Sequence, residues 1–183
     1  MGYEIAGGLG VKMAAPDREI YVMVGDGSYL MMNSEIVTSI QEGCKLTIVL
    51  VDNHGFSSIG GLSQSVGSGG FGTRYRYRNP QSGQLDGEPM PVDFAANARS
   101  LGAHAIQAHH LPSLKMALER AKEQDQTTVV VIETDPEQRV PGYESWWDVP
   151  IAEVSETASV RAAREAYQAA LRRERPLLGG RAG

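Results

Sequence analysis

Three uninterrupted apolar segments constrain the fold of this chain more than any other feature. They are "EIYVMV" (19–24), "LTIVLV" (46–51) and "TVVVIET" (128–134). Each is rich in β-branched residues and lacks a polar alternation, which is typical of strands that are buried on both faces of a sheet. Segments with helical spacing lie between them. The pattern therefore predicts an α/β fold with a parallel sheet flanked by helices on both faces.

The remaining elements follow from apolar spacing and from residues that favour helix ends. Asn33 is a candidate N-cap and Gly43 suits a helix end. The loop over 54–91, rich in Gly, Ser, Arg and Tyr, is too long for a simple connection, so we expect it to cover or border a site. The sequence predicts helices over 4–14, 33–43, 92–101, 111–123 and 153–174, and a short strand over 103–107.

Composition narrows the class of protein. At 183 residues the chain is long enough for one domain with a substantial core. A net charge of −5 argues against a broad surface for nucleic acid or anionic membrane, and no apolar run is long enough to span a bilayer. Cys44 is the single cysteine, so an internal disulfide cannot form and a cytoplasmic location is favoured.

Two polar clusters follow the first two strands. "GDGS" (25–28) comes directly after the first strand, and "DNHG" (52–55) comes directly after the second. A right-handed crossover would place these two strands side by side and parallel. Asp26 and Asn53 would then emerge close together at the carboxyl edge of the sheet, where open α/β folds bind ligands.

The chemistry of these clusters fits a metal bound to an anion. Asp26 offers a carboxylate, Asn53 an amide oxygen and Gly55 a backbone carbonyl, three ligands of the kind that Mg²⁺ prefers beside phosphate. Backbone N–H groups near a helix start can approach an anion; they belong to Gly25, Gly27 and Ser28. The alternative is a simple turn and an Asx-turn. That alternative is favoured for either cluster alone, and the metal site is favoured for both together.

These residues resemble the signature of thiamin-diphosphate-dependent enzymes. The pattern "GDGS…DNHG" resembles their Gly-Asp-Gly and Asp-Asn motifs, which implies Mg²⁺ ligands at Asp26, Asn53 and Gly55. "MGYEIAGGLGVKMAAPD" (1–17) is similar to the segment before the signature in acetolactate-synthase-like members. The resemblance, which covers about 1–135, implies that Met1 supports the bent cofactor; it also implies cofactor contacts at Gly2 and Phe56.

The family resemblance also implies partners. In the family an activating Glu lies on a pyrimidine-binding domain, upstream or on a separate chain. We therefore expect this chain to be a C-terminal fragment or one subunit of a split enzyme, inactive alone and part of a homo-oligomer when complete. The expected divisions are a cofactor domain over 1–150, a helical extension over 151–175 and a disordered tail over 176–183.

Two further segments indicate a substrate class. "DNHGFSSIGGLSQSVGSGGFGTRYRY" (52–77) and "YESWWDVP" (143–150) look most like family members that open a six-membered cyclic diketone by hydrolysis. That likeness implies formation of 5-deoxy-glucuronate in inositol catabolism. Two alternatives remain: a carboligase or decarboxylase of the acetolactate-synthase type, and a truncated module without catalysis.

Other features carry weaker expectations. His54 is equally compatible with a proton carrier and a spectator. "RYRYR" (74–78) favours a solvated loop or substrate lid over a single-strand binder, and "GGLGVKMA" (7–14) lacks the features of a dinucleotide loop. Three histidines are expected to be structural: His104, His109 and His110. Trp146 and Trp147 are expected to pack at an interface, with a role in closing the pocket as the alternative.

Overall fold

The computed structural model describes residues 1–70, 72–138, 140 and 148–174. The chain divides into two compact units, the sheet unit (1–57 and 74–138) and the second unit (58–73 and 139–183). The functional boundaries expected at 150 and 175 stay predictions, and the expected disordered tail lies outside the described residues. None of the described helices is both long and apolar enough to cross a bilayer.

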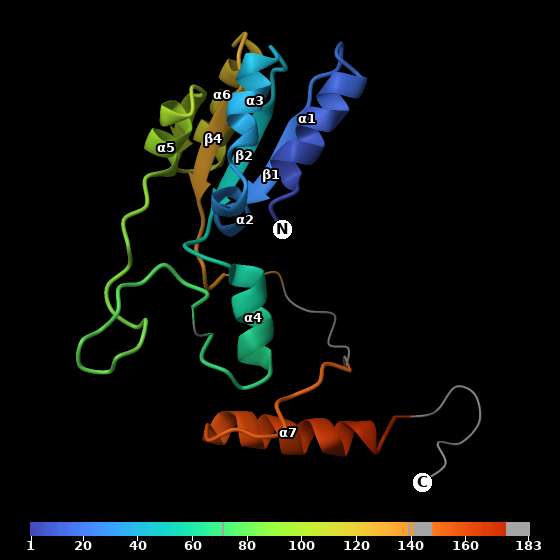
Figure 1. Ribbon diagram of the computed structural model, residues 1–183, viewed down its shortest axis with the longest axis vertical. Helices are drawn as coiled ribbons and strands as arrows, with labels where there is room; N and C mark the ends of the chain where they lie inside the picture. The colour runs from blue at the N-terminus through green and yellow to red at the C-terminus, as the bar shows by residue number, and fades with distance from the viewer. Residues whose placement is uncertain (71, 139, 141–147, 175–183) are drawn as a thin grey trace. The chain divides into compact units, whose positions relative to one another are not determined.

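The sheet unit is built on four parallel strands in the order β1-β2-β4-β3 (Figure 1). The strands are β1 (Tyr21–Gly25), β2 (Thr47–Asp52), β3 (His104–Ala108) and β4 (Thr128–Glu133). β2 and β4 occupy the centre, which explains why their segments are continuously apolar. The parallel sheet predicted from the sequence is confirmed. The expected burial of the first strand on both faces is wrong, because β1 lies at the sheet edge and exposes Tyr21 and Met23 on one face.

Helices cover both faces of this sheet. They are α1 (Glu4–Ala14), α3 (Glu35–Gln41), α5 (Phe94–Ser100) and α6 (Leu111–Lys122). Along β4, Val129 and Val131 belong to the cluster that includes side chains of α1, α3 and α5, whereas Val130 packs with Ala117 and Ala121 of α6. Successive residues of a strand point to opposite faces, so the layered α/β architecture is confirmed.

The first crossover differs from the expected single helix over 33–43. A six-residue helix, α2 (Asp26–Met31), begins directly after β1, and α3 follows it. The predicted N-cap role of Asn33 is wrong. Ser34 occupies the N-cap position, and the Asn33 side chain instead donates to Asn97 Oδ1 at 3.2 Å. A tertiary hydrogen bond to α5 has therefore replaced the local cap.

The second unit contains most of α4 (Ser57–Ser65) and all of α7 (Ala158–Leu171). The expected loop over 54–91 thus includes a helix, and the helix expected from 153 begins at Ala158. Ser159 Oγ donates to the carbonyl of Gly67 at 2.6 Å. A cavity of about 630 Å³ is lined by apolar residues that include Leu62, Val66, Val149, Ile151, Ala163 and Tyr167.

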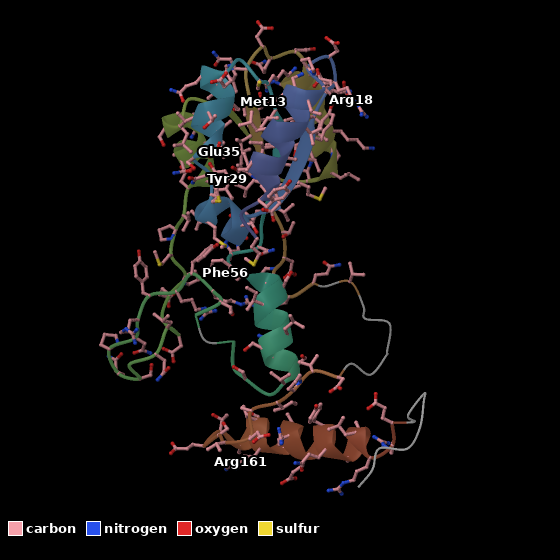
Figure 2. The ribbon with its side chains drawn as sticks, turned by 45° about the vertical axis from the view of Figure 1, so that its right-hand side comes forward. Met13, Arg18, Tyr29, Glu35, Phe56 and Arg161 are labelled. Carbon is pink, nitrogen blue, oxygen red and sulfur yellow. The ribbon has the colours of Figure 1, made fainter. Side chains whose placement is uncertain are left out.

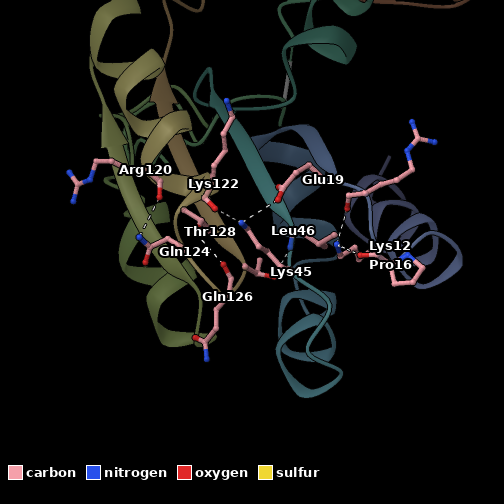
Figure 3. A network of polar contacts seen from close by, with 12 residues as sticks. Lys12, Pro16, Glu19, Lys45, Leu46, Arg120, Lys122, Gln124, Gln126 and Thr128 are labelled. Carbon is pink, nitrogen blue, oxygen red and sulfur yellow. Dashed lines mark hydrogen bonds and ion pairs between the residues drawn. The ribbon is translucent and has the colours of Figure 1, made fainter.

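A polar network holds the amino edge of the sheet (Figure 3). Lys45 Nζ, just before β2, donates to the carbonyl of Lys122 at 2.7 Å and lies 3.6 Å from a carboxylate oxygen of Glu19. The backbone N–H of Leu46 donates to Thr127 Oγ1 at 3.1 Å. These contacts tie the starts of β1, β2 and β4 together at the end of the sheet opposite the two polar clusters.

Candidate metal centre

The strand register brings the two polar clusters together. Gly25 pairs with Val51 across β1 and β2, so Asp26 and Asp52 leave the sheet side by side. Asp26 opens α2 and its side chain has no solvent exposure. Its Oδ2 accepts a hydrogen bond from the N–H of Gly55 at 2.7 Å. The closeness expected from topology is therefore present.

The side-chain amide of Asn53 completes this group. With its oxygen turned inward, Oδ1 accepts from Ser57 Oγ at 2.8 Å and lies 3.1 Å from Asp26 Oδ1 and 2.8 Å from the carbonyl oxygen of Gly55. With the amide turned over, Nδ2 occupies that place and donates to both oxygens. In the first orientation, three oxygen atoms, one each from Asp26, Asn53 and Gly55, lie close together with no proton between them.

This oxygen group fits a small hard cation. A carboxylate, an amide oxygen and a backbone carbonyl are ligands suited to Mg²⁺, with positions left open for phosphate or water. Across the described residues, no three His, Cys, Asp or Glu side chains gather into a metal-binding group. A single carboxylate with two neutral oxygens leaves a bound Mg²⁺ with a net positive charge, which favours an anionic ligand beside it.

The loop after β2 has a constrained backbone. His54 has a φ of 60°, in the left-handed region that non-glycine residues seldom adopt. Its N–H donates to Asp52 Oδ1 at 3.0 Å, and its Nε2 lies 2.7 Å from Glu133 Oε1 at the end of β4. These two carboxylates hold the residue between Asn53 and Gly55. The proton-carrier role of His54 stays a prediction.

Burial shapes the electrostatics of Asp26. It raises the pKa of this carboxyl from an ordinary 3.8 to about 6. Loss of solvation is the main cause, the N–H of Gly55 acts in the opposite direction, and the negative charge of Asp52 adds to the rise. A buried carboxylate of this kind is costly unless a cation compensates it.

Gly27 lies under an aromatic ring. A Cβ at this position would come within 2.6 Å of Phe56 Cδ1, so a larger residue would push the ring away. Figure 2 shows Phe56 next to α2. The Phe56 ring makes an edge-to-face contact with Tyr75, with centroids 6.1 Å apart. The Phe56 ring therefore links the start of α2 to the segment around Tyr75, which pairs with the loop over 52–55, here named the metal loop.

The other expected cofactor residues lie around α2. Gly2 is buried at a φ of 82° and packs against Met31 and Met32 at the end of this helix, while Met1 is 59% exposed. The positions flanking Asp26 are Gly25, the N-cap of α2, and Ser28, which is 8% exposed. Their cofactor contacts stay predictions.

The arginines of the expected lid have other partners. Arg74 pairs with Glu137 at 2.5 Å, Arg76 donates to the carbonyl of Gly87 at 3.4 Å, and Arg78 donates to the carbonyl of Gly83. All three thus hold their own loop or its surroundings. A substrate-lid role stays a prediction.

Two expectations concern histidines and tryptophans. His110 caps α6, because its Nδ1 accepts from the N–H of Ser113 at 3.1 Å; this structural role is confirmed. His109 lines a cavity of about 300 Å³ together with His54 and Glu133. Trp146 and Trp147 lie outside the described residues, so their expected interface role stays a prediction.

Sequence reasoning missed Tyr75 and Glu133 as neighbours of the site. The N–H of Tyr75 donates to the carbonyl of His54 at 3.4 Å, and Arg74 forms an antiparallel bridge with Gly55. The Arg-Tyr alternation over 74–78 was the available signal, since alternation is typical of an extended segment with one face turned inward.

Comparison with known proteins identifies the family. Residues 1–132 match the family model for thiamine pyrophosphate enzymes, C-terminal TPP binding domain. The chain belongs to this family. Thiamine pyrophosphate is thiamine diphosphate, so the family resemblance noted in the sequence is confirmed.

Individual relatives that are longer than this chain match it more closely than a family model can show. The chain is 47% identical over 175 residues to 3D-(3,5/4)-trihydroxycyclohexane-1,2-dione hydrolase 1 of Bacillus cereus, and equally to the Bacillus anthracis hydrolase of that name. The match covers 96% of this chain and 27% of each relative. The chain therefore spans about a quarter of the length of the curated relatives it matches.

A solved structure supports the fold. Rhodococcus jostii RHA1 thiamine diphosphate-dependent 4-hydroxybenzoylformate decarboxylase superposes with a TM-score of 0.59 at 20% identity. The superposed region covers 74% of this chain and 23% of the decarboxylase chain. At this identity the likeness concerns the arrangement of strands and helices.

Proposed function

We propose that this domain binds the diphosphate group of thiamine diphosphate through Mg²⁺ held by Asp26, Asn53 and Gly55. The observation that carries the proposal is the group of three oxygens, with Asn53 Oδ1 3.1 Å from Asp26 Oδ1 and 2.8 Å from the Gly55 carbonyl. Membership of the thiamine pyrophosphate enzyme family supports this cofactor. When bound, the cofactor would supply a nucleophilic carbon for attack on a carbonyl and an electron sink for cleavage of the adjacent C–C bond.

The amide of Asn53 serves the cofactor-free and the loaded domain in different orientations. Without a cation, its Nδ2 donates to Asp26 and Gly55 and so satisfies both acceptors. With a cation, its oxygen turns inward and is held there by Ser57. A rotation of this one amide converts the hydrogen-bonded arrangement into the group of three oxygens.

We further infer that the complete protein is a hydrolase that opens the ring of trihydroxycyclohexane-1,2-dione to 5-deoxy-glucuronate in myo-inositol catabolism. The 47% identity over 96% of this chain to hydrolases of that name supports this substrate. The rest of the relatives' length has room for the pyrimidine-binding domain and its activating Glu. The proposal includes a cytoplasmic homo-oligomer, a location supported by the single Cys44.

Calorimetric titration tests the binding proposal on the 183-residue chain. Thiamine diphosphate and inorganic pyrophosphate are each titrated in the presence and absence of Mg²⁺. Pyrophosphate is included because it needs only the diphosphate clamp and no pyrimidine-binding domain. We expect both to bind in a Mg²⁺-dependent manner, and Asp26→Ala to weaken binding at least about 100-fold because the only charged metal ligand is lost.

Asp17→Ala is the matched control. Asp17 is an exposed carboxylate beyond the end of α1, and its removal changes the net charge by the same amount. This variant should bind as the wild type does. Equal affinity of wild type and Asp26→Ala for both probes would overturn the proposed metal site.

A further inference from the structure

Three side-chain oxygens among the described residues of the sheet unit are shielded from solvent and have no hydrogen-bond partner: Glu4 Oε2, Thr47 Oγ1 and the hydroxyl of Tyr75. Of these three residues, Tyr75 contacts the loop that carries Asn53 and Gly55. The hydroxyl oxygen of Tyr75 is buried and makes no hydrogen bond to any described residue. A buried hydroxyl without a partner is unfavourable, and native structures rarely keep one without a reason. The position of this hydroxyl relative to the metal centre indicates the reason.

Tyr75 is attached to the metal loop through both its backbone and its ring. Its N–H donates to the carbonyl of His54, and the preceding residue, Arg74, bridges to Gly55. Its ring meets the edge of Phe56, which in turn lies against Gly27. The side chain is therefore placed by the two motifs that form the centre.

The electrostatic surroundings of the Tyr75 hydroxyl also connect it with the metal centre. The pKa of Tyr75 is raised, first by burial and then by the negative charges of Asp26 and Asp52. The Asp26 side chain also contributes to this rise in pKa as a prospective hydrogen-bond acceptor, but its contact with the Tyr75 hydroxyl falls short of normal hydrogen-bond geometry. The Asp26 oxygens face Gly55 and Asn53 instead.

Tyr29 provides a contrast within the same unit. It is fully buried and also meets a phenylalanine edge, Phe94, at 5.9 Å. Its hydroxyl donates to Asn97 Oδ1 at 2.8 Å. Burial alone raises the pKa of Tyr29 to about 12. The two tyrosines thus differ in whether the folded chain supplies an acceptor.

We infer that Tyr75 is a binding residue of the diphosphate and metal site, and that its hydroxyl donates to an anionic oxygen that arrives with the bound Mg²⁺–diphosphate group. This inference rests on the proposed function. An O–H donor beside the metal ligands stabilises an incoming phosphate oxygen, whereas in the cofactor-free chain the same donor has no acceptor. Removing the hydroxyl should therefore have opposite effects on the two states.

The test compares Tyr75→Phe with the matched control Tyr29→Phe. Thermal unfolding is measured without cofactor, and affinity for thiamine diphosphate and for pyrophosphate is measured with Mg²⁺. We expect Tyr75→Phe to keep or raise the cofactor-free Tm and to weaken both affinities about ten-fold, as for a lost hydrogen bond to a charged group. Tyr29→Phe should lower the Tm and leave both affinities unchanged.

The outcomes separate this inference from the proposed function. If Tyr75→Phe binds both probes as tightly as wild type while Asp26→Ala does not bind, the role of Tyr75 is overturned and the metal site stands. If Tyr75→Phe lowers the Tm as Tyr29→Phe does, the hydroxyl already has an acceptor and the inference is also overturned. If wild type and Asp26→Ala bind alike, both proposals fall.

Discussion

Asp26 combines a cost to folding with the charge that a metal site needs. Its side chain is fully buried, and its pKa is raised to about 6 because the ionised form loses solvation. In the folded, cofactor-free chain the ionised form is disfavoured relative to the unfolded chain. Below about pH 4, the ordinary pKa of this carboxyl, Asp26 is protonated in both states and its raised pKa contributes its full share to the free energy of unfolding. That contribution is lost as the pH rises through about 6.

Asp26→Asn should therefore stabilise the cofactor-free chain while removing Mg²⁺-dependent binding. The amide oxygen can still accept the Gly55 N–H, but the buried charge is gone. We expect the Tm difference between variant and wild type to grow from about pH 4 to about pH 6 and to level off above that. Scanning calorimetry without Mg²⁺ measures it, with exposed Asp17→Asn as control. A difference that stays constant across this range would contradict the argument.

At the scale of elements, the contact between α1 and β1 explains the glycines of the "GGLG" segment (7–10). A Cβ on Gly8 would lie 2.3 Å from Val22 Cγ2, whereas a Cβ on Gly10 would meet no atom within 4 Å. These residues lie within a helix, so the segment is not a dinucleotide loop. Gly8 lets the helix approach the strand that leads to Asp26.

Alanine at these two positions should act in opposite directions. Gly8→Ala overpacks a close helix–strand contact and should cost about 1–3 kcal/mol. Gly10→Ala gains helix propensity on an exposed face and should stabilise by up to about 1 kcal/mol. Urea unfolding of the two variants measures both effects. Equal stabilisation by both substitutions would show that α1 does not pack on Val22 as described.

Most sheet-unit elements could be predicted because burial imposes a pattern on them. The four strands and helices α1, α5 and α6 lie within two residues of their predicted bounds. α4 was missed because its "SSIGGLSQS" is rich in Ser and Gly, which have weak helix propensity. α2 was missed because a Gly-Asp-Gly sequence favours a turn.

The candidate site was predictable only as far as topology reaches. Asp26, Asn53 and Gly55 follow adjacent parallel strands, so their closeness follows from the crossover rule. The contacts of His54 with Glu133, and of Tyr75 with the metal loop, depend on how a strand end and a long loop return to the site. The Arg-Tyr alternation over 74–78 indicates an extended segment, but it does not indicate which part of the fold that segment packs against.

At the scale of the whole molecule, the relatives are much longer than this domain. The chain matches 27% of their length, and the family resemblance assigns the activating Glu to a pyrimidine-binding domain. We expect the 183-residue chain to bind Mg²⁺ pyrophosphate but not to open the ring diketone when supplied with thiamine diphosphate and Mg²⁺. A coupled assay, with the full-length Bacillus cereus hydrolase as positive control, measures this. Appreciable turnover by the chain alone would contradict the assignment of the activating Glu to a separate pyrimidine-binding domain.

The most direct test of the central claim is anomalous diffraction from crystals of this chain grown with Mn²⁺ and pyrophosphate. Mn²⁺ replaces Mg²⁺ at oxygen sites and gives a peak that identifies its own position. We predict one strong peak within bonding distance of Asp26 Oδ1, Asn53 Oδ1 and the Gly55 carbonyl, with pyrophosphate oxygens completing the shell. A well-occupied Mn²⁺–pyrophosphate group elsewhere, with no peak between these three oxygens, would contradict the account.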